Sequence, residues 1–133
     1  MSKIYIASTL NNPTHDAVAE ALKKQGHQIL DYRHPPHQIN PLETDTGLLD
    51  IPARAAEVLA SEKTEISNAD LTVAIYPFGL SVAAEIGFAL GVHTKCMIYA
   101  PTVKPEFDLW FLQILVANDL DELLEFADNP IYW

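Results

Sequence analysis

Five short apolar runs, separated by stretches with helical spacing, constrain this chain more than any other feature. The runs cover residues 4–7, 28–32, 71–76, 96–99 and 114–117, and each has the length of a strand. Between them, apolar residues recur every three or four positions, as in 17–22 and 55–66. Strands that alternate with helices form right-handed βαβ units, which build a parallel sheet covered by helices on both faces.

This alternation predicts a single α/β domain over residues 1–133, a flavodoxin-like or Rossmann-like three-layer sandwich around a five-stranded parallel sheet. Turn and capping residues set the expected helix ends. Asn12 before Pro13 predicts the start of the first helix and Gly26 its end. Ser81 is expected to cap a helix that runs to about Leu90 and is closed by Gly91.

The last third of the chain predicts two more helices and a tail. One helix opens near Pro105, and the last begins near Asp119. Residues 130–133 are expected to form a tail. The apolar run 105–111 has two open interpretations, an interface between subunits or ordinary packing of a helix on the sheet.

Composition excludes several classes of function. The net charge of −10 opposes binding to nucleic acid, which requires clustered Lys and Arg. No apolar run approaches the length of a membrane-spanning helix, and the N-terminus lacks a secretory signal, so we expect a cytoplasmic protein. The single cysteine, Cys96, lies in a strand-like run and is expected to be a core residue.

In a parallel α/β sheet, ligands bind beyond the carboxyl ends of the strands. Residues 33–50 are rich in proline and lack a period, so we expect this loop to cover the site. Tyr32 or His34 is expected to lie against a ligand bound there. His34 and His37 are separated by two prolines that no helix can accommodate, so no metal site is expected.

Two glutamates stand out by position. Glu62 falls inside the apolar stripe of the helix over residues 51–67, where partial burial would raise its pKa and suit it to acid catalysis. Alternatively it snorkels outward beside the solvent-type residues Lys63 and Glu65. Glu85 is expected in the first turn of the helix after the central strand, where the terminal amides would keep it ionised. Alternatively it only complements the helix dipole.

The chain resembles the nucleoside 2-deoxyribosyltransferase family, whose superfamily includes nucleotide N-glycosidases. The resemblance rests on residues 3–7 (KIYIA), the turn at 69–70, and the block 79–87 (GLSVAAEIG) followed by Ala89. It implies that Glu85 is the nucleophile, that Glu62 is the acid, and that Tyr5 orients the nucleophile. Tyr5 also suits an ordinary core position.

Two departures from the family bear on the substrate. Transferases of the family often carry an aspartate where this chain has Gly79, so the resemblance implies no base preference. The first loop lacks the glycine and arginine of phosphate-binding members. The residues expected to contact substrate are Ser8, Arg33, Gly79 and Ser81, although Ser81 also suits a helix cap.

We therefore expect an enzyme that cleaves or transfers the N-glycosidic bond of a nucleoside or nucleotide, without a cofactor, as a homo-oligomer. The alternative is a non-catalytic nucleotide-binding or sensor module on the same fold. A redox role is set aside because no Gly-x-Gly-x-x-Gly follows the first strand.

Overall fold

The expected alternation of strands and helices is present wherever the chain is described. The computed structural model describes residues 1–9, 12–30, 50–102 and 114–133, and only the backbone of residues 50–55. The elements are β1 (Lys3–Ala7), α1 (His15–Lys24), β2 (Gln28–Leu30), α2 (Asp50–Asn68), β3 (Leu71–Ile75), α3 (Leu80–Gly91), β4 (Lys95–Tyr99), β5 (Leu115–Ala117), α4 (Leu120–Asp128) and a short 3₁₀ helix, η1 (Pro130–Tyr132).

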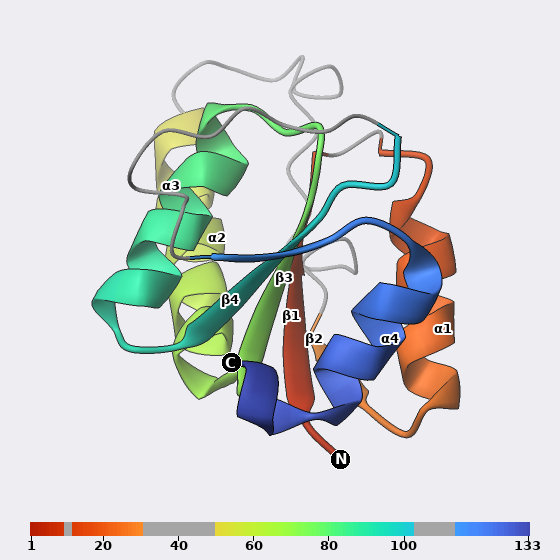
Figure 1. The fold of residues 1–133 in the computed structure, drawn as a ribbon. Helices are drawn as coiled ribbons and strands as arrows, with labels where there is room; N and C mark the ends of the chain where they lie inside the picture. The colour runs from red at the N-terminus through yellow and green to blue at the C-terminus, as the bar shows by residue number, and fades with distance from the viewer. Residues whose placement is uncertain (10–11, 31–49, 103–113) are drawn as a thin grey trace.

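The five strands form one sheet in the order β2-β1-β3-β4-β5, and all four neighbouring pairs are parallel (Figure 1). The strand order reverses between β1 and β3, as in flavodoxin-like folds. The predicted fold class is therefore confirmed. The reversal also marks the sheet edge at which such folds bind ligands.

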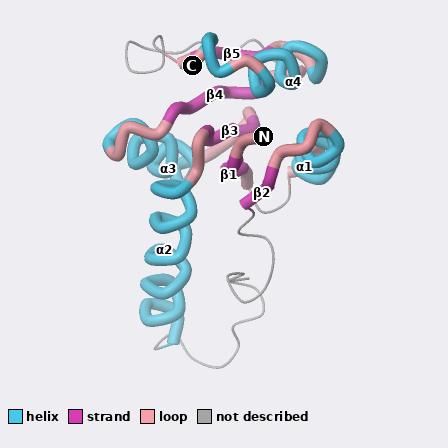
Figure 2. The backbone as a smooth tube through the Cα atoms, turned by 90° about the horizontal axis from the view of Figure 1, so that it is seen from below, coloured by secondary structure: helices cyan, strands magenta, loops and turns pink. Residues whose placement is uncertain are grey.

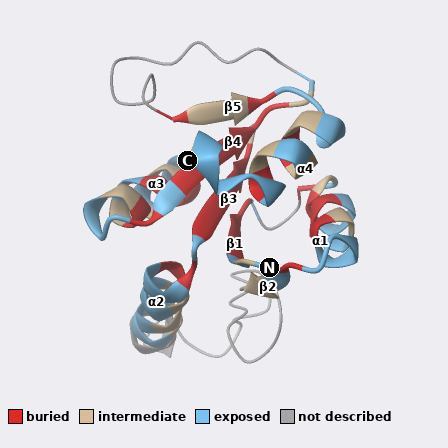
Figure 3. Ribbon diagram, turned by 60° about the horizontal axis from the view of Figure 1, so that its bottom comes forward, coloured by how far each residue is buried: buried red, intermediate tan, exposed pale blue. Residues whose placement is uncertain are grey.

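Two apolar clusters fill the two faces of the sheet. Ile4 and Ile6 of β1 pack on the side of α1 and α4, whereas Tyr5 and Ala7 face α2 and α3. This alternation follows from the two-residue period of a strand. Figure 2 shows α2 and α3 on one side of the sheet and α1 on the other, and Figure 3 shows the buried central strands between the helices.

Several predicted helix ends are wrong by one or two residues. Thr14, not Asn12, precedes α1, because the Asn12 side chain accepts hydrogen bonds from the Thr14 backbone N–H and hydroxyl and closes a turn before the helix. Gly79, not Ser81, is the N-cap of α3, and Gly91 is its last residue rather than its cap. The prediction for Gly26 is confirmed, since it follows the C-cap of α1 with φ of +92°.

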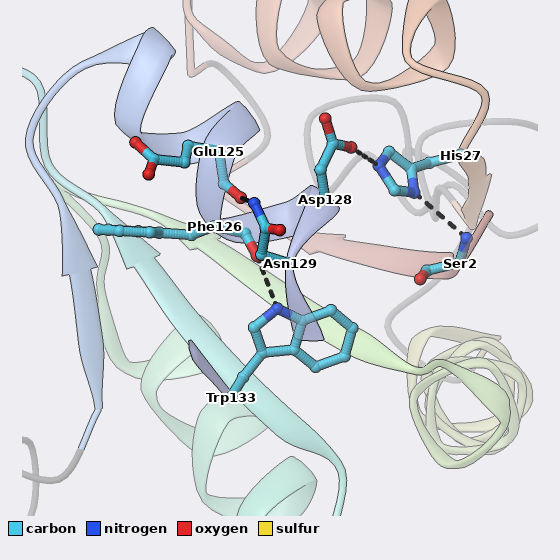
Figure 4. Close-up of polar contacts among 7 residues, drawn as sticks. All are labelled: Ser2, His27, Glu125, Phe126, Asp128, Asn129 and Trp133. Carbon is cyan, nitrogen blue, oxygen red and sulfur yellow. Dashed lines mark hydrogen bonds and ion pairs between the residues drawn. The ribbon is translucent and has the colours of Figure 1, made fainter. Parts of the chain in front are cut away.

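The C-terminal region differs from the expected tail. Residues 130–132 form η1, and the Trp133 indole N–H donates to the Phe126 carbonyl at 2.7 Å (Figure 4). Trp133 also packs against the core cluster. The role of Asp119 is confirmed, because its side chain accepts from the Glu122 backbone N–H. The predicted helix near Pro105 and the run 105–111 lie outside the described residues.

Candidate active site

Three elements bring the candidate catalytic residues together beside the point where the strand order reverses. Tyr5 comes from β1, Glu62 from α2 and Glu85 from α3. Because α2 and α3 lead into and out of β3, they lie side by side on one face of the sheet (Figure 1). Residues more than 50 positions apart in the sequence therefore meet in one place.

Glu85 occupies a different position from the one expected. The helix α3 begins at Leu80, so Glu85 lies in its second turn, and the first turn holds no acidic residue. The terminal amides therefore do not explain its charge state. Burial, followed by repulsion from Glu62, raises the pKa of Glu85 from 4.5 to about 7, while hydrogen bonding to Tyr5 acts in the opposite direction. Glu85 is thus poised between its charged and neutral forms near neutral pH.

Tyr5 is fully buried beside these carboxylates. Burial is the main cause that raises the pKa of its hydroxyl, and the negative charges of Glu85 and Glu62 add to it, so Tyr5 stays protonated and acts as a donor. The hydroxyl is near enough to Glu85 for hydrogen bonding to affect both pKa values. Among the described residues, however, neither Tyr5 Oη nor Glu85 Oε2 has a hydrogen-bond partner, so the two side chains are adjacent but these atoms are not hydrogen-bonded to each other.

Glu62 and Glu85 line the same cavity, which has a volume of about 260 Å³ and lies between α2 and α3. Glu62 is half-buried, so it neither packs fully into the core nor points freely into solvent. The stripe that predicted it is less buried than expected, because Leu59 is 50% exposed and Ile66 alone is fully buried among the stripe residues whose side chains are described. The carboxylate pair is therefore accessible from a hollow large enough for a small ligand.

The sequence interpretation missed a third carboxylate. Glu65 was expected to be a solvent residue, yet its Oε2 is buried and its charge contributes to the raised pKa of Tyr5. Glu65 follows Glu62 by three residues, which places both on neighbouring positions of one helix face. This three-residue spacing from Glu62 is the sequence signal that could have identified Glu65.

The loop after β1 holds a second polar group. Ser8 and His15 are buried, and Ser8 Oγ lies 2.5 Å from His15 Nδ1. His15 is fully buried at the start of α1. In this structure the Ser8 hydroxyl contacts His15, and its contact with substrate stays a prediction. Arg33, Tyr32, His34 and the covering loop lie outside the described residues.

Gly79 and Ser81 stand at the start of α3, and both are exposed. Ser81 also lines the cavity that holds Glu62 and Glu85, although it makes no side-chain cap. A Cβ built on Gly79 would meet nothing within 4 Å. The absence of an aspartate here therefore has no steric cause.

Three further features of the described chain concern its cysteine, its potential metal ligands and its potential membrane helices. Cys96 is buried in the core, and burial raises the pKa of its thiol to about 12, which suppresses thiolate chemistry. No group of three His, Cys, Asp or Glu residues suited to a metal ion occurs among the described residues. Of the helices in the described ranges, none is long and apolar enough to cross a membrane.

Two solved structures have an architecture similar to that of this chain. The 2-deoxyribosyltransferase of the psychrotolerant bacterium Bacillus psychrosaccharolyticus superposes with a TM-score of 0.71 over 95% of this chain and 94% of its own, at 22% identity. The chain shares the fold of a 2-deoxyribosyltransferase. The CMP N-glycosidase BcmB of Clostridium botulinum has a TM-score of 0.57 and 15% identity, covering 96% of this chain and 99% of that one.

No family model matches the chain. No curated protein sequence gives a significant match either. The resemblance to the 2-deoxyribosyltransferase fold therefore lies in the structure, over almost the whole of both chains, at a sequence identity of 22%.

Proposed function

We propose that this protein is an enzyme that cleaves or transfers the N-glycosidic bond of a nucleoside or nucleotide. The observation that carries the proposal is the pair of carboxylates, Glu62 and Glu85, on two helices around one cavity. A 2-deoxyribosyltransferase and a CMP N-glycosidase share the fold, which supports the same class of reaction here. Two carboxylates suit this chemistry, because one meets the oxocarbenium-like centre while the other protonates the leaving group.

In the proposed mechanism, ionised Glu85 attacks the anomeric carbon, and a carbon–oxygen bond forms as the carbon–nitrogen bond breaks. Protonated Glu62 gives its proton to the departing base. Water or a second base then attacks the anomeric carbon and releases Glu85 as a carboxylate, while Glu62 takes up the proton of the incoming group. Tyr5, protonated and adjacent to Glu85, positions the nucleophile.

The direct test is incubation of the purified protein with deoxynucleosides and their monophosphates, with and without a second free base, followed by chromatography. We expect release or exchange of the base, lost in Glu85→Ala and Glu85→Gln and strongly slowed in Glu62→Gln. Glu57→Gln is the matched control, because Glu57 is an exposed glutamate on the same helix. A fully active Glu85→Gln would exclude covalent catalysis by this residue.

Binding of these ligands without any product would instead indicate the nucleotide-binding or sensor module. Thermal stabilisation by the same ligands separates the two results, because a ligand at one hundred times its Kd adds about 2.7 kcal/mol to the free energy of unfolding. The cytoplasmic location and the homo-oligomeric state stay predictions from the sequence.

A further inference from the structure

Beyond the carboxylates, the cavity is lined by an aromatic ring and by a lysine. Phe88 lies two turns along α3 from Ser81, at a distance of about 10 Å along the helix axis. Opposite it on α2 are Lys63 and Ile66, one residue and one turn beyond Glu62. The catalytic pair therefore stands midway, with a small polar end at Ser81 and an aromatic end at Phe88.

The aromatic end combines a flat ring with a movable cation. The Lys63 ammonium lies 5.8 Å from the centroid of the Phe88 ring, within the range of a cation–π contact. Phe88 is half-buried and packs against the core, so its ring is held in place, whereas Lys63 is exposed and loses little by moving. Neither residue has a part in the proposed bond cleavage.

These observations predict the orientation of a substrate in the cavity. The anomeric carbon must sit at the carboxylate pair, which leaves one end of the cavity for the sugar and the other for the base. Ser81 can hydrogen-bond a sugar hydroxyl and Ala84 leaves room beside it, whereas the Phe88 face suits a heterocycle, since aromatic rings stack on bases. Glu62, which must protonate the base, is next to Lys63 on the same helix.

We propose that Phe88 and Lys63 form the base subsite and select bases that carry a carbonyl oxygen over those that carry an amino group at the same position. This inference rests on the proposed function. The base displaces the ammonium from the ring face and stacks on Phe88, and the ammonium moves to the edge of the base. An ammonium only donates hydrogen bonds, so it pairs with a carbonyl oxygen and faces an amino group without a bond.

Deoxyinosine and deoxyadenosine form the sharpest test, because they differ only in the oxo or amino group on the six-membered ring and in whether the adjacent ring nitrogen carries a proton. We expect wild type to prefer deoxyinosine, and Lys63→Gln to lower kcat/KM for deoxyinosine roughly tenfold or more while changing that for deoxyadenosine far less. Phe88→Leu retains an apolar side chain without the ring face and is expected to raise KM for both substrates. Lys24→Gln, at an exposed lysine of α1, is the control.

The outcomes separate this inference from the proposed function. Suppose that wild type is active. If Lys63→Gln keeps the preference for deoxyinosine, or if Phe88→Leu leaves KM unchanged, the subsite is overturned and the proposed bond cleavage still stands. If wild type acts on no donor, the proposed function fails, and calorimetric titration with free hypoxanthine and free adenine still tests the subsite. Hypoxanthine binding that is tighter than adenine binding and is weakened in Lys63→Gln supports it, while equal binding overturns it.

Discussion

Glu85 carries the charge state on which the proposed chemistry depends. Its pKa is raised to about 7, first by burial and then by the neighbouring charge of Glu62. In the proposed mechanism Glu85 is ionised while Glu62 holds a proton, so the pair must keep one proton, which it loses above about pH 7. We therefore expect kcat/KM to fall as pH rises through a limb near 7. A rate that keeps rising above pH 7 would show that the reaction needs both carboxylates ionised and would contradict Glu62 as the acid.

Glu62→Gln should remove this falling limb and leave one that rises with pH below 7, because only ionised Glu85 is then required and its pKa loses one of the causes that raise it. The residual activity of the variant is measured across pH 4–9 and compared with Glu57→Gln, in which the falling limb should stay near 7. A falling limb that persists in Glu62→Gln would contradict the coupling of the two carboxylates.

The free energy of unfolding should also depend on the protonation of Glu85. Glu85 binds its proton more tightly in the folded state, about 7, than in the unfolded chain, about 4.5, so stability falls as pH rises between these values. Glu85→Gln removes this dependence. Urea unfolding at pH 5 and pH 8 should show wild type losing stability relative to the variant, and an equal loss in both proteins would exclude Glu85 as the cause.

Gly79→Asp tests the departure from the transferase pattern. Gly79 is the N-cap of α3, its φ of −104° suits any residue, and the space around it is open. Aspartate can accept from the first free amides of the helix, so we expect about 0.5–1 kcal/mol of added stability in urea unfolding. Gly79→Ala is the control for backbone entropy, and equal gains in both variants would exclude capping.

At the scale of the elements, a single glycine determines how α1 passes into β2. Gly26 has φ of +92°, a conformation that residues with a side chain rarely adopt. Gly26→Ala should lower the free energy of unfolding by about 1–2 kcal/mol. Gly87→Ala is the counterpart, since Gly87 lies inside α3 with open space around it, and it should raise stability by about 0.5–1 kcal/mol in the same denaturant titration. Equal effects would contradict the conformational argument.

At the scale of the whole molecule, His27 joins three distant parts of the chain (Figure 4). Its Nδ1 accepts from the Ser2 backbone N–H at 3.2 Å, so the ring proton lies on Nε2, which donates to Asp128 at 2.7 Å. The N-terminus, the end of α1 and the end of α4 therefore meet at one buried imidazole. This cluster lies at the amino end of the sheet, away from the carboxylate cavity.

A double-mutant cycle with His27→Ala and Asp128→Ala measures this link. We expect each single change to lower stability by about 1–3 kcal/mol and the coupling energy to reach about 0.5–3 kcal/mol. The exposed pair Lys23 and Glu20, whose ions lie 3.6 Å apart, is the control and should couple by less than about 0.5 kcal/mol. Equal coupling in the two pairs would show that burial of His27 adds nothing.

The sequence by itself determined the local structure. The strand runs, the helical stretches and the parallel sheet follow from periods of two and of three to four residues, which the chain carries in neighbouring positions. It also singled out Glu62 and Glu85. Helix ends were less certain, because the side chain of Asn12 formed a turn of its own and Gly79 replaced Ser81 as a cap.

Only the tertiary structure decided the environment of these residues. Four features arise between residues on different elements. They are the raised pKa of Glu85, the burial of Tyr5, the burial of Glu65 Oε2 and the contact between Lys63 and Phe88. Burial and charge act through space, over a few ångströms. A one-dimensional pattern records what lies along a helix or strand, and the packing of β1, α2 and α3 determines what lies across from it.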